Sequence, residues 1–151
     1  MPLAAVIATP RTHRDALSAA LLAAELNEPF DLVHTPSVVF AELFTAVQVL
    51  RKSVPFATFR LLRRISCDDR DELRVGAARA LANFAEIYPD RVEELLLPLA
   101  CDPSRRVRNA AAETLARLLT VAPELPERWR WHPDRAVAVL DKARRFAAKR
   151  G

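Results

Sequence analysis

The chain has 151 residues, of which 51% are hydrophobic and 28% are charged, and its net charge is +4. This length fits one domain, and the composition is that of a globular protein rather than of a disordered one. Only two glycines occur, which favours helix and leaves little scope for a glycine-rich phosphate loop. No apolar run approaches the ~20 residues that span a bilayer, and residues 3–8 are too short for the core of a signal peptide. We therefore expect a cytoplasmic protein without a membrane segment.

In the first third of the chain, apolar residues recur at helical spacing after an opening segment, residues 1–11, that has no clear period. The pattern predicts a helix over residues 12–27, a second over 37–51 and a third that begins at Pro55 and ends near Ser66. The buried stripe predicted for the third helix is Phe56, Phe59, Leu62 and Ile65.

The middle of the chain contains one passage written twice. CDDRDELRVGAARALANFA begins at Cys67, and CDPSRRVRNAAAETLARLL begins at Cys101, 34 positions later. A period in this range is typical of stacked helical repeats. Asp68 and Asp102 are predicted to be the N-caps of the two matched helices, and Pro103 is predicted to occupy the first helical position.

Four helices are predicted from this passage onward: over residues 68–87, from Pro89, over 103–121 and over 134–149. Their predicted buried residues are, in turn, Leu73, Ala77, Leu81 and Phe84; Val92, Leu95, Leu96 and Leu99; Val107, Ala111, Leu115 and Leu118; and Ala136, Val139, Leu140, Ala143 and Phe146. The Pro-Asp-Arg of residues 89–91 recurs at 133–135, after about ten inserted residues. We interpret the last helix as the counterpart of the helix from Pro89, and expect it to cap the stack together with the insertion.

A helix opened by proline, a turn with aspartate, and a second helix with an arginine, an alanine pair and a leucine together resemble the HEAT repeat. Asp68 with Arg74 and Asp102 with Arg108 carry this resemblance, which is close over residues 55–121 and weak over 37–54. It implies an all-α fold, a short right-handed α-α superhelix (a HEAT-like solenoid) of about seven helices. The implied single domain, 1–151, has repeat units of about 12–54, 55–88 and 89–122 and a C-terminal cap of 123–151. In related folds, the recurring aspartates and arginines form caps and ion pairs between repeats.

The residues that could carry chemistry do not form a catalytic pattern. Cys67 and Cys101 lie at matched positions of neighbouring repeats, at least ~8–10 Å apart, and a disulfide needs Cα atoms within ~7 Å. We predict that both cysteines are small buried packing residues. Neighbouring carboxylates in a helix point in different directions, and no nucleophile or metal-ligand motif occurs. The prediction is a chain without enzymatic activity, cofactor or metal.

The resemblance implies that the second helix of each pair lines the concave side of the solenoid. Matched exposed positions there alternate in sign, which does not suit a phosphate backbone. We therefore predict a scaffold that binds a protein partner through this face. The predicted contact residues are Arg79, Asn83, Arg106, Asn109, Glu113 and Arg117.

An alternative is nucleic-acid binding through the arginine-rich end, because residues 104–151 carry twelve basic against five acidic residues. Tryptophans that alternate with arginine can stack on bases while the guanidinium holds a phosphate. The contacts predicted under this alternative are Arg105, Arg106, Arg108, Arg128, Trp129, Arg130, Trp131, Arg144 and Arg145. A weaker possibility is a base-excision enzyme built on Trp129, Trp131 and Asp134, since HEAT-like DNA alkylpurine glycosylases combine a helical solenoid with such residues. The remaining interpretation is that both tryptophans cover the open end of the solenoid.

Overall fold

The computed structural model describes residues 55–150, and every regular element in this range is helical. The helices predicted over 12–27 and 37–51, and the repeat unit 12–54, lie outside the described residues. The described elements are α4 (Pro55–Ile65), α5 (Asp71–Ala80), the short 3-10 helix η1 (Leu81–Phe84), α6 (Pro89–Ala100), α7 (Arg105–Val121), α8 (Leu125–Trp129) and α9 (Asp134–Arg150). The all-α class is confirmed for this part of the chain.

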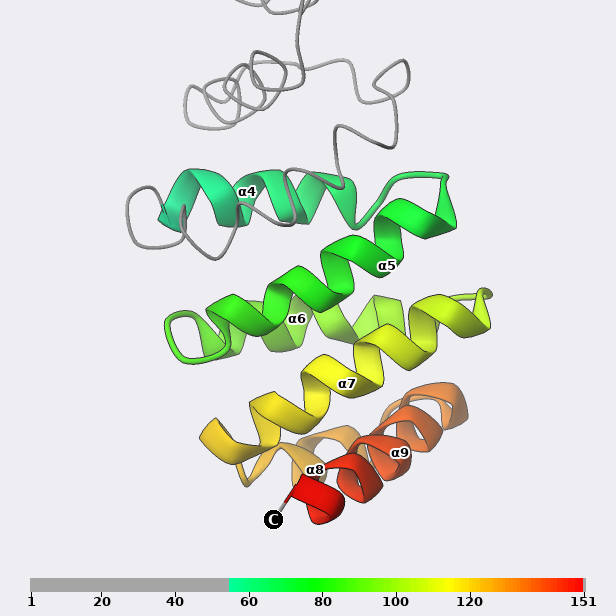
Figure 1. Cartoon of the computed structure of the whole chain (residues 1–151). Coiled ribbons are helices and arrows are strands. Elements are labelled where there is room, and N and C mark those ends of the chain that lie inside the picture. The colour runs from blue at the N-terminus through cyan, green and yellow to red at the C-terminus, as the bar shows by residue number, and fades with distance from the viewer. Residues whose placement is uncertain (1–54, 151) are drawn as a thin grey trace, which may run out of the picture.

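The helices stack in two layers. In Figure 1, α5, α7 and α9 run side by side in the same direction at the front, and α6 and α8 lie behind them. Helix α7 packs along α5 on one side and along α9 on the other. This is the arrangement of a helical solenoid, in which each helix pair buries its apolar face against its neighbours.

The core consists largely of the residues that the helical spacing predicts. In α5 with η1 and in α7, all eight predicted residues are at most 2% exposed. Alanines Ala77, Ala78 and Ala110 are also buried, which allows α5 and α7 to approach closely. At this contact the Thr114 hydroxyl donates a hydrogen bond of 2.6 Å to the carbonyl of Ala78, near the point where α5 changes to the 3-10 helix.

Three predicted core residues are not fully buried. Leu95 and Phe146 only pack against the edge of the core. Phe56 is 50% exposed, so its assignment to the buried stripe of α4 is wrong. The guanidinium groups of Arg60 and Arg91 cover the Phe56 ring instead, at 5.7 and 5.8 Å from its centroid.

The two repeated aspartates hold the turns before α5 and α7 rather than capping these helices. Asp68 accepts a hydrogen bond of 2.9 Å from the backbone N–H of Arg70, and Asp102 accepts one of 2.9 Å from that of Ser104. The N-caps are therefore Arg70 and Ser104, two residues later than predicted. Since α7 begins at Arg105, the prediction that Pro103 is its first helical residue is also wrong. A short aspartate side chain that binds the N–H two residues ahead makes a turn of its own.

The ion pairs expected between repeats, which we call the ladder, are represented by one bidentate pair. Arg74 of α5 donates from Nε and Nη2 to the Asp102 carboxylate, at 2.8 and 3.1 Å. Its Nη1 donates to the carbonyls of Asp68 and Asp69, at 2.9 and 2.8 Å. One guanidinium thus fixes its own turn and joins it to the next, as planar bidentate pairing allows.

Acidification should weaken the turn before α5. Hydrogen bonding from Arg70 lowers the pKa of Asp68. Its carboxylate therefore stabilises the fold above the unfolded-state pKa of ~3.9, and this contribution is lost as the pH falls through the lower folded-state pKa. We expect the difference in free energy of unfolding between wild type and Asp68→Asn to be constant at neutral pH and to shrink below about pH 4. Urea titrations across this range measure it, with Asp69→Asn as a control for the lost charge. A difference that persists unchanged at low pH would contradict the ion-paired carboxylate.

The prediction for the cysteines is wrong in one respect. Cys67 is exposed and Cys101 is half-buried, and both are free thiols. Cys67 lies two residues after the end of α4, and Cys101 directly follows α6. Cys101 packs against the edge of the core.

The last helix pair differs from its interpretation in the sequence. Helix α9 packs along α7, in the same layer as α5 and α7. It is therefore not the counterpart of α6, which lies in the layer behind. The short α8, formed by the inserted residues, takes the place behind, against α6. The repeated Pro-Asp-Arg triplets therefore begin helices of different layers.

None of the helices between residues 55 and 150 is both long enough and apolar enough to cross a membrane.

Candidate binding face

We call the exposed side of α5, α7 and α9 the second-helix face. The six residues predicted to contact a protein partner all lie on the α5–η1 and α7 part of the chain, at intervals of three or four residues that keep them on one side of a helix. Arg79, Arg106 and Arg117 are exposed, and Asn83, Asn109 and Glu113 are half-buried.

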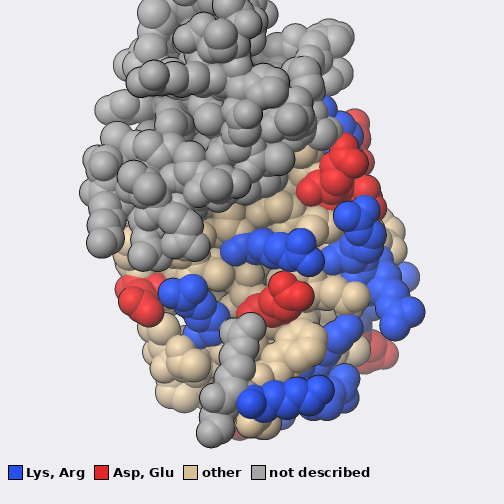
Figure 2. Space-filling model, viewed as in Figure 1, with Lys and Arg blue, Asp and Glu red and all other residues tan. Residues whose placement is uncertain are grey.

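Cross-helix contacts place these residues beside one another. Arg79 of α5 lies 3.4 Å from the Glu113 carboxylate of α7. Lys142 of α9 donates a hydrogen bond to the side-chain carbonyl of Asn109. Figure 2 accordingly has blue and red side chains interspersed over the described part of this face, with blue more frequent toward the edge where α7 begins in Figure 1.

The tryptophan segment is divided between the interior and the surface. Trp129 ends α8 and is fully buried, and its indole N–H donates a hydrogen bond of 3.3 Å to Glu93 of α6. Trp131 is 79% exposed, and the guanidinium of Arg130 lies 4.7 Å from the centre of its ring. The alternation of aromatic and arginine in the sequence therefore does not produce two adjacent stacking surfaces. The interpretation that the segment covers the end of the stack fits Trp129 only.

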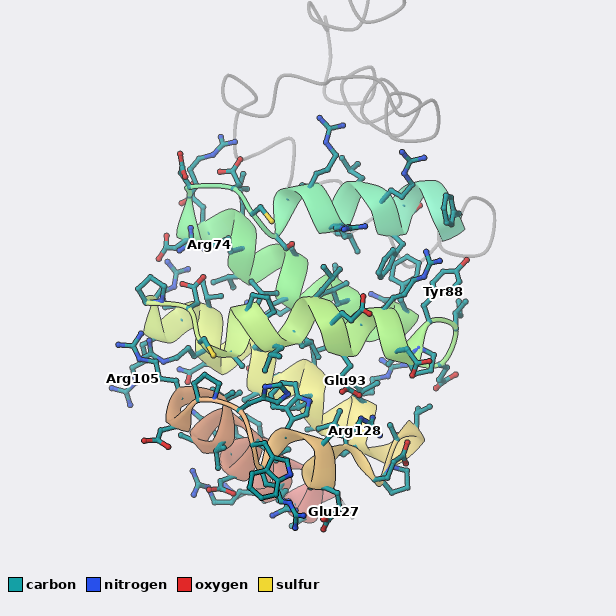
Figure 3. The ribbon with its side chains drawn as sticks, turned by 180° about the vertical axis from the view of Figure 1, so that it is seen from behind. Arg74, Tyr88, Glu93, Arg105, Glu127 and Arg128 are labelled. Atoms are coloured by element: carbon teal, nitrogen blue, oxygen red, sulfur yellow. The ribbon has the colours of Figure 1, made fainter. Side chains whose placement is uncertain are left out.

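Arg128 faces α6, on the side of the stack away from the second-helix face. It forms ion pairs with Glu93 of α6 and with Glu124, and the hydrogen bonds that it donates to Glu93 raise its pKa. Figure 3 displays Arg128 and Glu93 together between α6 and α8, far from Arg105 at the edge of the stack. Arg130 is paired with Glu127 at 3.2 Å. The residues proposed for nucleic-acid contact thus fall into separate places, with Arg144 and Arg145 exposed on α9.

A comparison with protein families agrees with this architecture. The family model described as HEAT repeats matches residues 59–142, which is more than half of the 151 residues. The chain belongs to the HEAT-repeat family. No curated protein and no solved structure matches it significantly.

The HEAT-repeat stack also creates a cavity that the sequence alone did not reveal. A hollow of about 210 Å³ lies between α7 and α9, lined by Arg105, Arg108 and Asn109 from α7 and by Arg135 and Lys142 from α9, together with two small apolar residues. Arg135 and Lys142 were missed as site residues because α9 was not expected beside α7. The sequence did contain one indication of a basic site at the start of α7. The acidic pair that begins α5, Asp71 and Glu72, is replaced in register by the basic pair Arg105 and Arg106, so the charge reverses between the two HEAT repeats.

The described HEAT repeats contain no clustered metal ligands. Between residues 55 and 150, no three histidine, cysteine, aspartate or glutamate side chains gather as they would around a metal ion.

Proposed function

We propose that this HEAT-repeat chain is a non-enzymatic scaffold that binds a protein partner through its second-helix face. The observation that carries the proposal is the cross-helix arrangement of mixed charges on that face, of which the exposed Arg79–Glu113 pair is the centre. Stacked helices hold such charges at fixed separations. A fixed pattern of both signs provides specificity and faster association with a complementary protein surface.

The charges on this face are available to a partner. The side chains of Arg79 and Glu113 are 62% and 45% exposed. An exposed ion pair contributes little to stability, about 0–1 kcal/mol, so a partner can rearrange it at small cost. Ile87 and Val121 are 46% and 39% exposed and lie 34 positions apart, in the turn after η1 and at the last residue of α7. They add apolar contact area of the kind that protein interfaces combine with polar residues.

The test is partner capture with charge-reversed variants. Immobilised chain is incubated with an extract of its own cells, and the affinity of the retained protein is then measured with the purified components. We expect Arg79→Glu with Arg117→Glu to weaken binding by about tenfold or more. Arg91→Glu with Arg130→Glu, at exposed positions in α6 and directly after α8, is the matched control for two reversed charges. Equal binding by both double variants would refute the assignment of the face.

Nucleic-acid binding through the arginine-rich end is the alternative function. Burial of Trp129 and pairing of Arg128 with two carboxylates weigh against it. Trp131 is exposed and serves as a fluorescent reporter for a titration with a single-stranded oligonucleotide at low and moderate salt. No response at either salt supports the protein-binding proposal, whereas a response that falls steeply with salt would favour the alternative.

A further inference from the structure

The cavity between α7 and α9, which we call the basic cavity, is lined by four cationic side chains. Arg105 and Arg108 come from α7, and Arg135 and Lys142 come from α9. No acidic residue lines it, and none of these four cations has a carboxylate within 4.0 Å among the described residues. Like charges held this closely repel one another, and an anion in the cavity relieves that repulsion.

The ladder of ion pairs between repeats stops at this cavity. Arg108 is the counterpart of Arg74, and its Nη1 donates to the carbonyls of Asp102 and Pro103 at 2.7 and 3.0 Å, as Arg74 does one repeat earlier. In Arg74 the remaining edge of the guanidinium, Nε and Nη2, binds Asp102. Within residues 55–150, nothing accepts a hydrogen bond from that edge of Arg108, because the turn before α9, residues 130–133, contains no aspartate.

The start of α7 adds to the positive charge. Helix α5 begins with Asp71 and Glu72, whereas α7 begins with Arg105 and Arg106 and has no acidic residue in its first turn. Cations at this end of a helix are unfavourable with respect to the helix dipole. Figure 3 places Arg105 at the same edge of the stack as Arg74, so the charge-reversed turn lies one step along the ladder.

From these contacts we infer that the basic cavity binds a carboxylate from an acidic segment of a partner protein. The Arg74–Asp102 pair is the precedent within the molecule, since a carboxylate against Arg108 would repeat it one repeat later. Arg105, Arg135 and Lys142 surround the neighbouring acidic side chains of the same segment. At about 210 Å³ the cavity is smaller than the ~300–1,000 Å³ of a typical small-molecule site, which suits one or two side chains rather than a cofactor. This inference rests on the proposed function, because it assigns the chemistry of the partner.

The test uses a fluorescein-labelled hexaglutamate peptide, with hexaglutamine as the uncharged control. Fluorescence anisotropy should give saturable binding of hexaglutamate only. Arg105→Gln with Arg135→Gln should weaken it by about tenfold. Both arginines are exposed, so these variants are expected to stay folded, and their thermal unfolding by circular dichroism verifies this. Arg144→Gln with Arg145→Gln removes the same charge from exposed positions of α9 outside the cavity and should change binding by less than about twofold.

Three results would overturn the inference. Absence of hexaglutamate binding, or an equal loss with the two double variants, would mean that the cavity does not recognise carboxylates. Tighter binding of an oligothymidylate or of inorganic phosphate, lost in the same cavity variant, would assign the cavity to phosphate instead. Failure of this inference can be told apart from failure of the proposed function. A captured partner that binds the Arg105→Gln, Arg135→Gln variant as tightly as wild type refutes the role of the cavity alone. Hexaglutamate binding that requires the cavity, without any effect of Arg79→Glu and Arg117→Glu on a partner, refutes the face alone.

Discussion

Replacing Trp129 with alanine is expected to lower the free energy of unfolding by about 3–5 kcal/mol, the usual range for a large aromatic residue in a core. Trp129 is the largest fully buried side chain between residues 55 and 150, and it is the last residue of the five-residue helix α8. So short a helix has little stability of its own, because helix formation has a costly nucleus. Its position depends on the indole, which also donates to Glu93. Urea unfolding followed by circular dichroism measures the change.

The matched control for this prediction is Trp131→Ala. Trp131 is 79% exposed, so its removal should change stability by no more than about 0.5 kcal/mol. Hydrogen exchange adds a spatial readout, because each unit of a repeat stack contacts only its neighbours. We expect amide protection to fall most in α8 and α9 of the Trp129 variant. Similar stability of the two tryptophan variants would contradict the burial of Trp129.

Removing the ladder arginine is the second large effect, and Arg74→Ala is expected to cost about 2–3 kcal/mol. Arg74 makes four hydrogen bonds, and its side chain and that of Asp102 are only 15% and 9% exposed. Breaking a buried pair costs ~3–5 kcal/mol, and we place this pair lower because solvent reaches the arginine. After the substitution, the described contacts leave the Asp102 carboxylate with the N–H of Ser104 as its donor.

Arg108→Ala provides the comparison within the same molecule. Arg108 makes the same two bonds to turn carbonyls but has no aspartate, so its removal should cost only about 1 kcal/mol. The difference between the two variants, measured as the shift in urea midpoint, isolates the contribution of the pairing to Asp102. Equal shifts would mean that the bidentate pair does not stabilise the fold.

The resemblance to HEAT repeats was sufficient to predict ion pairs between repeats, because it drew attention to aspartates and arginines that recur 34 positions apart. The resemblance did not indicate which residues pair: it matched Asp68 with Arg74 and Asp102 with Arg108, whereas in the structure Arg74 pairs with Asp102 of the next repeat. The period could not reveal how the aspartate is used locally. The same carboxylate must accept from Arg74 and from the N–H of Ser104, and this moves the start of α7 two residues beyond the predicted cap.

The sequence could not predict that Trp129 and Trp131 differ in burial. Two tryptophans separated by one residue look alike in a list of residues, yet one is fully buried and the other is 79% exposed. Trp129 lies on the inner side of α8 and meets Glu93, 36 positions away in the sequence. The local pattern of residues does not indicate a contact between positions so far apart in the sequence.

By itself the sequence determined the helical class, the repeat, and most of the buried positions between Phe59 and Ala143. It did so because apolar residues at helical spacing must be buried whichever helix covers them. Only the tertiary structure decided that α9 packs beside α7. That one placement brings Arg105 and Arg108 together with Arg135 and Lys142 and forms the basic cavity. Contacts between helices depend on how distant segments pack, and the inserted residues before α9 interrupt the repeat that would otherwise have indicated its neighbour.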